Sequence, residues 1–228
     1  MNKKIKHVFF DLDHTLWDFD KNSELTFEKI FNIHNVDIEL NDFLEIYVPI
    51  NFKYWKLYRE EKVTKTQLRF GRLKDAFDAL RVEVSDDLIN TLSEDYINYL
   101  SNFNNVFEGA HDILDYLSTN YTLHIITNGF AEAQDKKIKA SKMSHYFKTI
   151  TNSEMVGVKK PNPKIFNYAL QQADASPEES IMIGDSVEAD IEGALNVGID
   201  TIYFDYKNVN SQKQYKRITE LKAIKDFL

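Results

Sequence analysis

The chain has no cysteine, and this absence excludes both a disulfide framework and a thiolate zinc site. It also lacks long apolar stretches: no uninterrupted apolar run exceeds three of its 228 residues, which excludes a membrane-spanning helix. Acidic residues outnumber basic ones, and the net charge of −8 argues against a nucleic-acid polymer as partner. A small phosphorylated ligand stays possible, because one lysine and a divalent cation can supply the positive charge that it needs.

The N-terminus, MNKKIK, is similar to the basic start of a signal peptide. The apolar region that should follow is interrupted after residues 8–10 by Asp11 and Asp13, so secretion is not expected. We therefore expect a cytoplasmic protein without a membrane attachment. Composition is compatible with either a monomer or a homodimer.

Glycine is scarce, and six of the seven glycines lie between positions 109 and 198, where tight loops between strands and helices are expected. Strand-like runs occupy residues 6–10, 121–126, 180–183 and 201–204. Helical stretches lie near residues 110–118, 131–142, 163–173 and 188–197. This alternation predicts βαβ units and a parallel sheet.

Residues from about 22 to 103 show only helical signals, and Pro49 is expected to break or kink the helix that contains it. Residues 219–228 are predicted to form a last surface helix. The sequence therefore predicts an α/β fold with a Rossmann-like parallel sheet core. The core would comprise residues 1–16 and 104–228, with an all-helical domain of residues 17–103 inserted after the first strand.

Acidic residues directly follow the first predicted strand, in the segment DLDHTLWD. The Asp11 carboxylate could attack phosphorus and form a covalent intermediate, which splits one difficult step into two. The Asp13 carboxyl could give a proton to the leaving oxygen and later take one from water. Considered alone, the segment could equally be a solvated acidic turn with Thr15 as a helix cap.

Two further polar sites lie in the part of the chain that is predicted to form the α/β core. Thr127, Asn128 and Gly129 come after a strand and could bind a substrate oxyanion through the hydroxyl and main-chain N–H groups. Lys160, which precedes a proline, could bind a phosphate as a point charge, whereas the adjacent Lys159 is expected to be solvated. Alone, these residues could form an Asn-Gly turn and an ordinary surface lysine.

The fourth site is GDSVEAD, which follows the strand at residues 180–183. Asp185 at the strand end and Asp190 one helical turn later could bind a hard cation through oxygen ligands. Each of the four sites has an ordinary structural explanation. Their common position at strand ends favours a ligand site, because open α/β sheets bind ligands at the carboxyl ends of their strands.

The order D-x-D-x-T, then Ser/Thr, then Lys, then G-D-x-x-x-x-D resembles the haloacid dehalogenase-like hydrolase superfamily. The similarity is to its phosphatase branch, in which a helical cap is inserted after the first motif. It implies that Asp11 is the nucleophile and Asp13 the general acid and base. It also implies that Thr127 hydrogen-bonds the transferring phosphoryl group and that Lys160 clamps it.

The same resemblance implies a Mg²⁺ site formed by Asp11, Asp185 and the backbone carbonyl of Asp13. Asp190 would support the metal site either through a bound water molecule or by contacting the residues that bind the metal. His14 lies at a position that varies in relatives, and no role is assigned to it. Four carboxylates facing a phosphate dianion would repel it without a cation and a lysine, so the charge pattern agrees with this set.

The presence of Asp13 favours a phosphatase over a 2-haloacid dehalogenase, because an alkoxide leaving group needs a proton and a halide does not. A sugar-phosphate phosphatase or phosphomutase remains an alternative, since both keep the two acids. A non-enzymatic phospho-acceptor domain is a weaker alternative, because such domains carry the acceptor on a later strand and lack a large insertion after the first.

Three segments resemble bacterial pyrimidine 5′-nucleotidases: FDLDHTLWDFD, residues 67–72, and IITNGF with EMVGVKKPNPKIFNYAL. This similarity implies a nucleoside monophosphate as substrate. Trp55 and Tyr58 lie three residues apart on a predicted helix and are our candidates for contacting a base or sugar. Either ring could instead belong to the core of the inserted domain.

Overall fold

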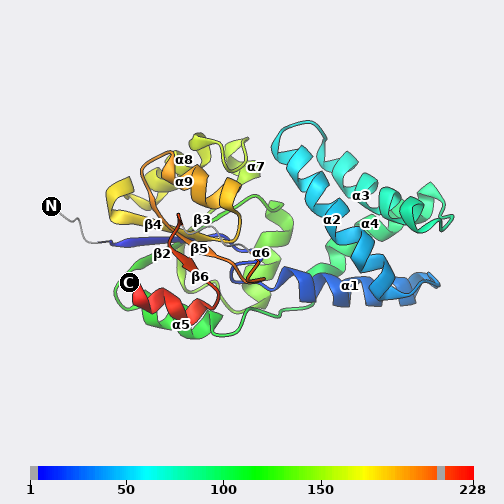
Figure 1. Cartoon of the computed structure of the whole chain (residues 1–228), viewed down its shortest axis with the longest axis horizontal. Coiled ribbons are helices and arrows are strands. Elements are labelled where there is room, and N and C mark those ends of the chain that lie inside the picture. Colours follow the sequence, from blue (N-terminus) through cyan, green and yellow to red (C-terminus); the bar gives the residue numbers. More distant parts are fainter. Residues whose placement is uncertain (1–4, 210–213) are drawn as a thin grey trace. The chain divides into compact units, whose positions relative to one another are not determined.

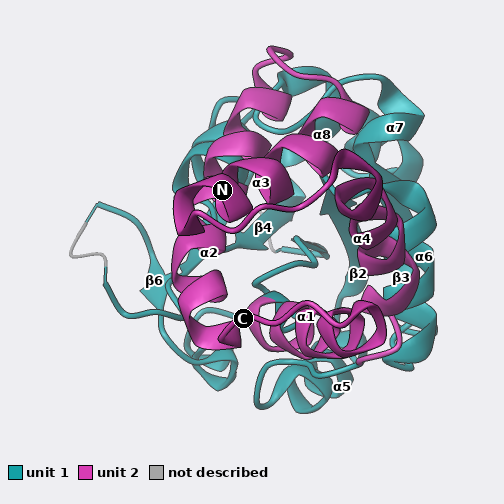
Figure 2. Ribbon diagram, turned by 90° about the vertical axis from the view of Figure 1, so that its right-hand side faces the viewer, with its two compact units in different colours: residues 1–19, 104–228 teal, residues 20–103 magenta. Residues whose placement is uncertain are grey.

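The computed structural model describes residues 5–209 and 214–228. The chain divides into two compact units, of which unit 1 comprises Met1–Phe19 with Asn104–Leu228 and unit 2 comprises Asp20–Phe103 (Figure 2). The border therefore lies after Phe19, three residues later than the sequence suggested. Trp17 is fully buried in unit 1, where its backbone bridges to Asp13 and Val106, so it is part of the core of that unit.

Unit 1 contains a six-stranded sheet in which every pair of neighbouring strands is parallel, in the order β3-β2-β1-β4-β5-β6 (Figure 1). The strands are β1 (His7–Phe10), β2 (Thr122–Thr127), β3 (Phe147–Asn152), β4 (Ser180–Gly184), β5 (Asp200–Phe204) and β6 (Arg217–Ile218). The expected Rossmann-like α/β core is confirmed. Two strands, β3 and β6, were not expected from the sequence.

Helices cover both faces of this sheet (Figure 1). They are α5 (Ala110–Ser118), α6 (Ala131–Ala140), α7 (Ser153–Val156), α8 (Pro163–Ala173) and α9 (Gly193–Leu195), with 3₁₀ helices at Pro177–Glu179 and Leu221–Asp226. A π-helix, Val187–Glu192, precedes α9 where the sequence suggested one continuous helix. The C-terminal helix is a 3₁₀ helix, shorter than the predicted residues 219–228.

An apolar core of unit 1 lies between the sheet and the α8–α9 layer. Phe9 of β1 and Met182 of β4 meet Ile165 and Phe166 of α8 there, and all four side chains are fully buried. Apolar residues on α8 recur at helical spacing, so one face of the helix packs on the sheet. This packing fixes the central strands, from whose ends the polar loops emerge.

Unit 2 consists of four helices in the part of the chain that the structure describes. They are α1 (Phe19–His34), α2 (Leu40–Arg59), α3 (Lys65–Leu80) and α4 (Asp86–Leu100). Thr64 and Gln67 form a reciprocal capping box at the start of α3. Pro49 was expected to break or kink its helix, and the first of these alternatives is wrong, because α2 continues through the proline. Proline removes one backbone donor, and the buried residues on both sides of it keep the helix in place.

Aromatic rings form the core of unit 2, with Phe27 contacting Phe31, Phe43, Tyr47 and Tyr96 at centroid distances of 4.7–5.5 Å. The predicted substrate contacts are outside this core. Trp55 and Tyr58 are partly exposed on α2, with ring centroids 5.8 Å apart in an edge-to-face arrangement. No described helix of the chain is long and apolar enough to cross a membrane.

Candidate active site

The central strands bring the predicted motifs to one edge of the sheet. Phe10, the last residue of β1, lies level with Ile125 of β2 and Ile183 of β4. The backbone N–H of Asp11 donates to the Ile183 carbonyl at 2.9 Å, which places Asp11 between the ends of β2 and β4. Thr127, the last residue of β2, and the loop that carries Asp185 therefore lie at the same edge, as expected for the carboxyl edge of a parallel sheet.

Lys160 is the centre of the hydrogen-bond network at this edge. Its buried ammonium donates to Asp11 Oδ1 at 2.7 Å, to Asp190 Oδ1 at 2.6 Å and to the Ile126 carbonyl at 2.7 Å. An ammonium has three N–H donors, and this arrangement uses all of them. A phosphate oxygen can therefore reach the Lys160 ammonium only by replacing one of these acceptors.

Charge and burial oppose each other strongly at this site. Burial raises the pKa of the Asp11 carboxyl to about 7, with Lys160 opposing the rise and Asp190 adding to it. Burial also raises the pKa of Asp185, and the Asp190 and Asp11 carboxylates add to the increase. Burial alone lowers the pKa of Lys160, but these carboxylates outweigh it and hold the pKa above its usual value. The site thus lacks positive charge.

The acidic groups have the composition of a site for a hard cation. One carboxylate oxygen each from Asp11, Asp185 and Asp190 lies within 4.8 Å of the others. Among the residues that the structure describes, Lys160 is the cation that pairs with the Asp11 and Asp190 carboxylates. A divalent cation fits such a donor set, because Mg²⁺ prefers oxygen ligands. The side chain of Asp13 is not part of this group, so only its backbone carbonyl remains as a predicted ligand.

Asp190 approaches the site closely because of its neighbours. Its Oδ2 accepts the Ser186 backbone N–H at 3.0 Å. A Cβ at Gly184 would lie 2.4 Å from the same oxygen, so only glycine fits at the end of β4. The glycine of the GD motif therefore makes room for the second acid of that motif.

The hydroxyl of Thr127 is oriented by two donors. Its Oγ1 accepts the Gly129 backbone N–H at 3.1 Å and Gln134 Nε2 at 2.7 Å. A hydroxyl has two acceptor lone pairs and one proton. Because the lone pairs are occupied, the proton is left to donate to another group, such as a phosphoryl oxygen.

Two residues that the sequence analysis did not select hold Asp13. Gln134 Nε2 donates to Asp13 Oδ2 at 2.8 Å, and Lys137 Nζ donates to Asp13 Oδ1 at 2.6 Å. Both residues come from α6 and are buried. Their spacing of three on a predicted helix was the one available signal, because it places them on one face. Polar residues on helices are usually solvated, so this signal was weak.

Asn128 orients the lysine loop. Its Oδ1 accepts the Lys160 backbone N–H at 2.7 Å, and its Nδ2 donates to the Lys160 carbonyl at 3.0 Å. Its role as a substrate contact remains a prediction. His14, to which no role was assigned, has a positive φ of 61°, and the Tyr206 hydroxyl lies 2.9 Å from its Nδ1.

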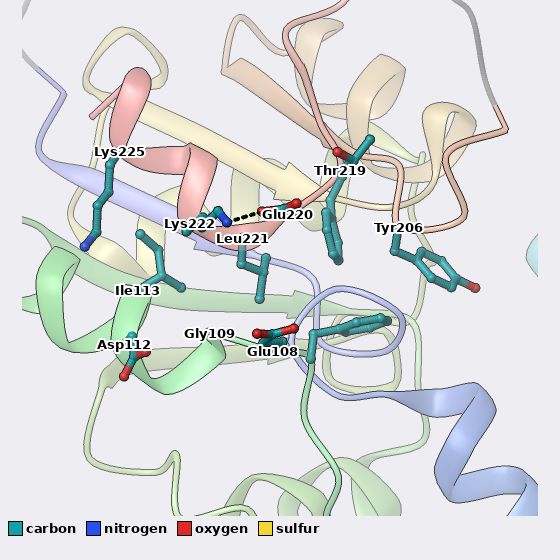
Figure 3. Close-up of a pocket in the computed structure, with 12 residues that line it drawn as sticks. Glu108, Gly109, Asp112, Ile113, Tyr206, Thr219, Glu220, Leu221, Lys222 and Lys225 are labelled. Atoms are coloured by element: carbon teal, nitrogen blue, oxygen red, sulfur yellow. Dashed lines mark ion pairs between the residues drawn. The ribbon is translucent and has the colours of Figure 1, made fainter.

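A cavity of about 560 Å³ lies elsewhere in unit 1, next to α5 and the C-terminal 3₁₀ helix (Figure 3). Its lining includes Phe204 and Tyr206, and the ion pair between Lys222 and Glu220 lies at its wall. None of the predicted site residues lines it. Tyr206, one of its lining residues, also contacts His14 in the loop after β1.

Comparisons with known proteins identify the family of the chain. Residues 8–204 match the family model described as haloacid dehalogenase-like hydrolase. Pyrimidine 5′-nucleotidase YjjG of Escherichia coli is 35% identical over 200 residues, which cover 87% of this chain and 85% of that protein. Glyceraldehyde 3-phosphate phosphatase of Pyrococcus furiosus is 32% identical over 242 aligned positions, which cover 99% and 94%.

A solved structure from the same family has a similar fold over the whole chain. The HAD-hydrolase YfnB of Bacillus subtilis, bound to magnesium, matches 99% of each chain with a TM-score of 0.89 and 29% sequence identity. The relatives are named phosphatases and nucleotidases, and the family match covers both the first and the last of the predicted motifs. The chain is therefore an enzyme that belongs to the haloacid dehalogenase-like hydrolase family.

Proposed function

We propose that this hydrolase cleaves phosphomonoesters in a Mg²⁺-dependent reaction and forms a phosphoryl intermediate on Asp11. The observation that carries the proposal is the environment of the Asp11 carboxylate. It is buried directly after β1, accepts a hydrogen bond from Lys160 at 2.7 Å, and has one carboxylate oxygen each from Asp185 and Asp190 within 4.8 Å. Such a carboxylate is oriented for attack and has a partner charge in place.

The proposed ligands of Mg²⁺ are Asp11, Asp185 and the backbone carbonyl of Asp13. Asp190 contacts both Lys160 and the Ser186 backbone, so it supports the site rather than adding a further direct ligand. The cation, when bound, supplies positive charge that polarises the phosphoryl oxygens and offsets the repulsion between anions. The magnesium bound to YfnB supports Mg²⁺ as the cation.

The residues of the chain then divide the reaction into two steps. Asp11 forms a bond to phosphorus while the bond from phosphorus to the leaving oxygen breaks, and Asp13 donates a proton to that oxygen. Next, Asp13 takes a proton from a water molecule that attacks the phosphoryl group, which releases inorganic phosphate and restores Asp11. Throughout, the free hydroxyl proton of Thr127 is available to a phosphoryl oxygen.

We propose a pyrimidine nucleoside 5′-monophosphate as the substrate. The support is the similarity to YjjG together with the partly exposed aromatic pair Trp55 and Tyr58, which offers stacking surfaces. The similarity to a glyceraldehyde 3-phosphate phosphatase supports sugar phosphates as the alternative. A screen of phosphomonoesters with Mg²⁺ tests both, and the proposal predicts the highest kcat/KM for uracil and thymine nucleotides.

The mechanism is tested with Asp11→Asn. This variant should fold but show no turnover, because a carboxamide cannot attack phosphorus. Acid quenching of the wild-type enzyme during turnover of a substrate labelled in its phosphate group should leave the labelled phosphoryl group on Asp11 and on no serine or histidine. Residual activity of the variant within tenfold of wild type would contradict the mechanism.

The metal is tested separately by chelation. Activity should be lost in excess chelator and return with Mg²⁺, whereas Ca²⁺ should replace it poorly, because its larger size and looser geometry disturb in-line attack. Asp185→Ala should impair the response to Mg²⁺ severely, and Asp190→Ala should impair it less. Full activity without a divalent cation would contradict the proposal that these acidic residues bind a metal required for the reaction.

A further inference from the structure

We propose that Gln134 and Lys137 are positioning residues that aim the Asp13 carboxyl at the leaving oxygen. The inference rests on the proposed function, since it concerns the proton that Asp13 delivers. It assigns a role in the reaction to α6, which none of the recognised motifs includes. The evidence comes from the contacts of the two side chains, their burial and one glycine.

Both oxygens of Asp13 are fixed from the same helix face. Lys137 Nζ donates to Oδ1 at 2.6 Å and Gln134 Nε2 donates to Oδ2 at 2.8 Å. A carboxylate held at both oxygens has lost the rotation about its last side-chain bond. The two donors therefore set the direction in which Asp13 can present a proton.

Gln134 also sets the spacing between two catalytic groups. The same Nε2 that contacts Asp13 donates to Thr127 Oγ1 at 2.7 Å, so one amide joins the proposed acid to the proposed phosphoryl ligand. A Cβ at Gly129 would lie 2.1 Å from this nitrogen. Glycine is therefore needed at position 129, because the carboxamide of Gln134 occupies the space that a side chain there would fill.

Lys137 is buried, although lysine side chains are usually exposed to solvent. Its side chain is 3% exposed, and its ammonium lies 4.3 Å from the ring centroid of Trp17 and 5.2 Å from that of Phe19. Burying an ammonium is costly unless it is paired, and the paired carboxylate here is that of Asp13. The two aromatic rings restrict the ammonium to the position from which it contacts Oδ1.

A purely structural role would also explain a buried ion pair between α6 and the loop after β1. The two explanations differ in how the enzyme should treat leaving groups. An alkoxide, such as a nucleoside 5′-oxygen, needs a proton as its bond to phosphorus breaks, whereas a nitrophenolate leaves as a stable anion. A misdirected Asp13 therefore impairs the first reaction selectively, whereas general damage to the site impairs both.

The test compares kcat/KM of wild type and Lys137→Met on uridine 5′-monophosphate and on 4-nitrophenyl phosphate, with Mg²⁺. This ratio reports the step that forms the Asp11 intermediate. We expect a loss of about a hundredfold or more on the nucleotide, in the range of general acid catalysis, and less than about tenfold on the aryl ester. Gln134→Leu should show the same selectivity, and Lys137→Arg should restore part of the lost nucleotide activity.

A second readout is the burst of nitrophenolate. Asp13 also activates the water of the second step, so in Lys137→Met that step should become slow and a burst equivalent to the enzyme concentration should precede steady turnover. The matched control is Lys136→Met, an exposed lysine on the same helix, which should behave as wild type on both substrates.

Equal losses on the two substrates, with no burst, would overturn the inference and leave Lys137 as a structural residue. Failure of the proposed phosphatase reaction would look different, because wild type itself would then hydrolyse neither substrate. If only the pyrimidine preference fails, wild type still cleaves 4-nitrophenyl phosphate, and the comparison is made with the alkyl phosphate that the screen ranks first. Thermal unfolding of each variant identifies any that has lost its fold, and Lys137→Arg keeps the charge if Lys137→Met proves unstable.

Discussion

His124 gives a stability prediction whose magnitude follows from the structure. It lies on β2 with no exposed surface, its Nδ1 is 2.8 Å from Thr149 Oγ1, and its Nε2 is 3.1 Å from His7 Nδ1. Burial lowers the pKa of His124 to about 4, with His7 and Lys148 adding to the effect. The folded protein therefore strongly favours the neutral imidazole.

The sign follows from comparing the folded and unfolded chains. An unfolded histidine takes up a proton as the pH falls below its ordinary value of 6.5, whereas folded His124 does so only near 4. This contribution to stability is therefore complete above pH 6.5 and is lost between pH 6.5 and 4. The total loss is about 3 kcal/mol, of which about 2 kcal/mol is lost by pH 5.

The assay is urea unfolding of wild type and His124→Gln at about pH 8 and pH 5. Glutamine does not titrate, so the variant should be less stable at the higher pH but should lose about 2 kcal/mol less on acidification. The raised pKa of Asp11 acts in the opposite direction in both proteins and cancels in the comparison. His145→Gln, at an exposed histidine, is the matched control. Identical pH slopes for wild type and His124→Gln would refute the reasoning.

Three further changes test the site. Gly129→Ala should displace Gln134, whose Nε2 would be 2.1 Å from the new Cβ, and lower kcat/KM about a hundredfold while urea unfolding changes little; unchanged activity would contradict the tight fit. Gly184→Ala should push Asp190 away and weaken Mg²⁺ binding in calorimetric titration, and wild-type affinity would count against that view. Trp55→Ala should lower kcat/KM about tenfold or more on pyrimidine nucleotides and much less on an aryl phosphate, as a lost base stack predicts; equal losses with a lower Tm would instead assign the ring to the core of unit 2.

The sequence predicted the central strands and the loops at their ends because their signals are local. Each of those strands is a short apolar run that ends at a polar loop, and the pattern needs no knowledge of distant residues. β3, with the sequence FKTITN, was missed because only two of its residues are strongly apolar. Its place in the sheet comes from pairing with β2, which is a tertiary effect.

In the candidate site, too, residues within local motifs could be selected from the sequence, whereas residues placed by tertiary packing could not. Lys160 was distinguished from its neighbour Lys159, and the structure buries the first and leaves the second partly exposed. Lys136 and Lys137 show the limit of such reasoning. They are adjacent on one helix, and only the three-dimensional packing reveals that Lys137 turns inward to Asp13 while Lys136 stays exposed.

The position of unit 2 within the sequence also bears on the order of folding during synthesis. The neighbours of β1 in the sheet, β2 and β4, lie more than a hundred residues later in the chain. Unit 2, in contrast, is one continuous segment, Asp20–Phe103. As the chain leaves the ribosome, unit 2 has all its residues while the strand that carries Asp11 still has no partner strand. Asp11, the proposed nucleophile, is therefore synthesised before unit 2 but reaches its final surroundings only after β2 and β4 have followed.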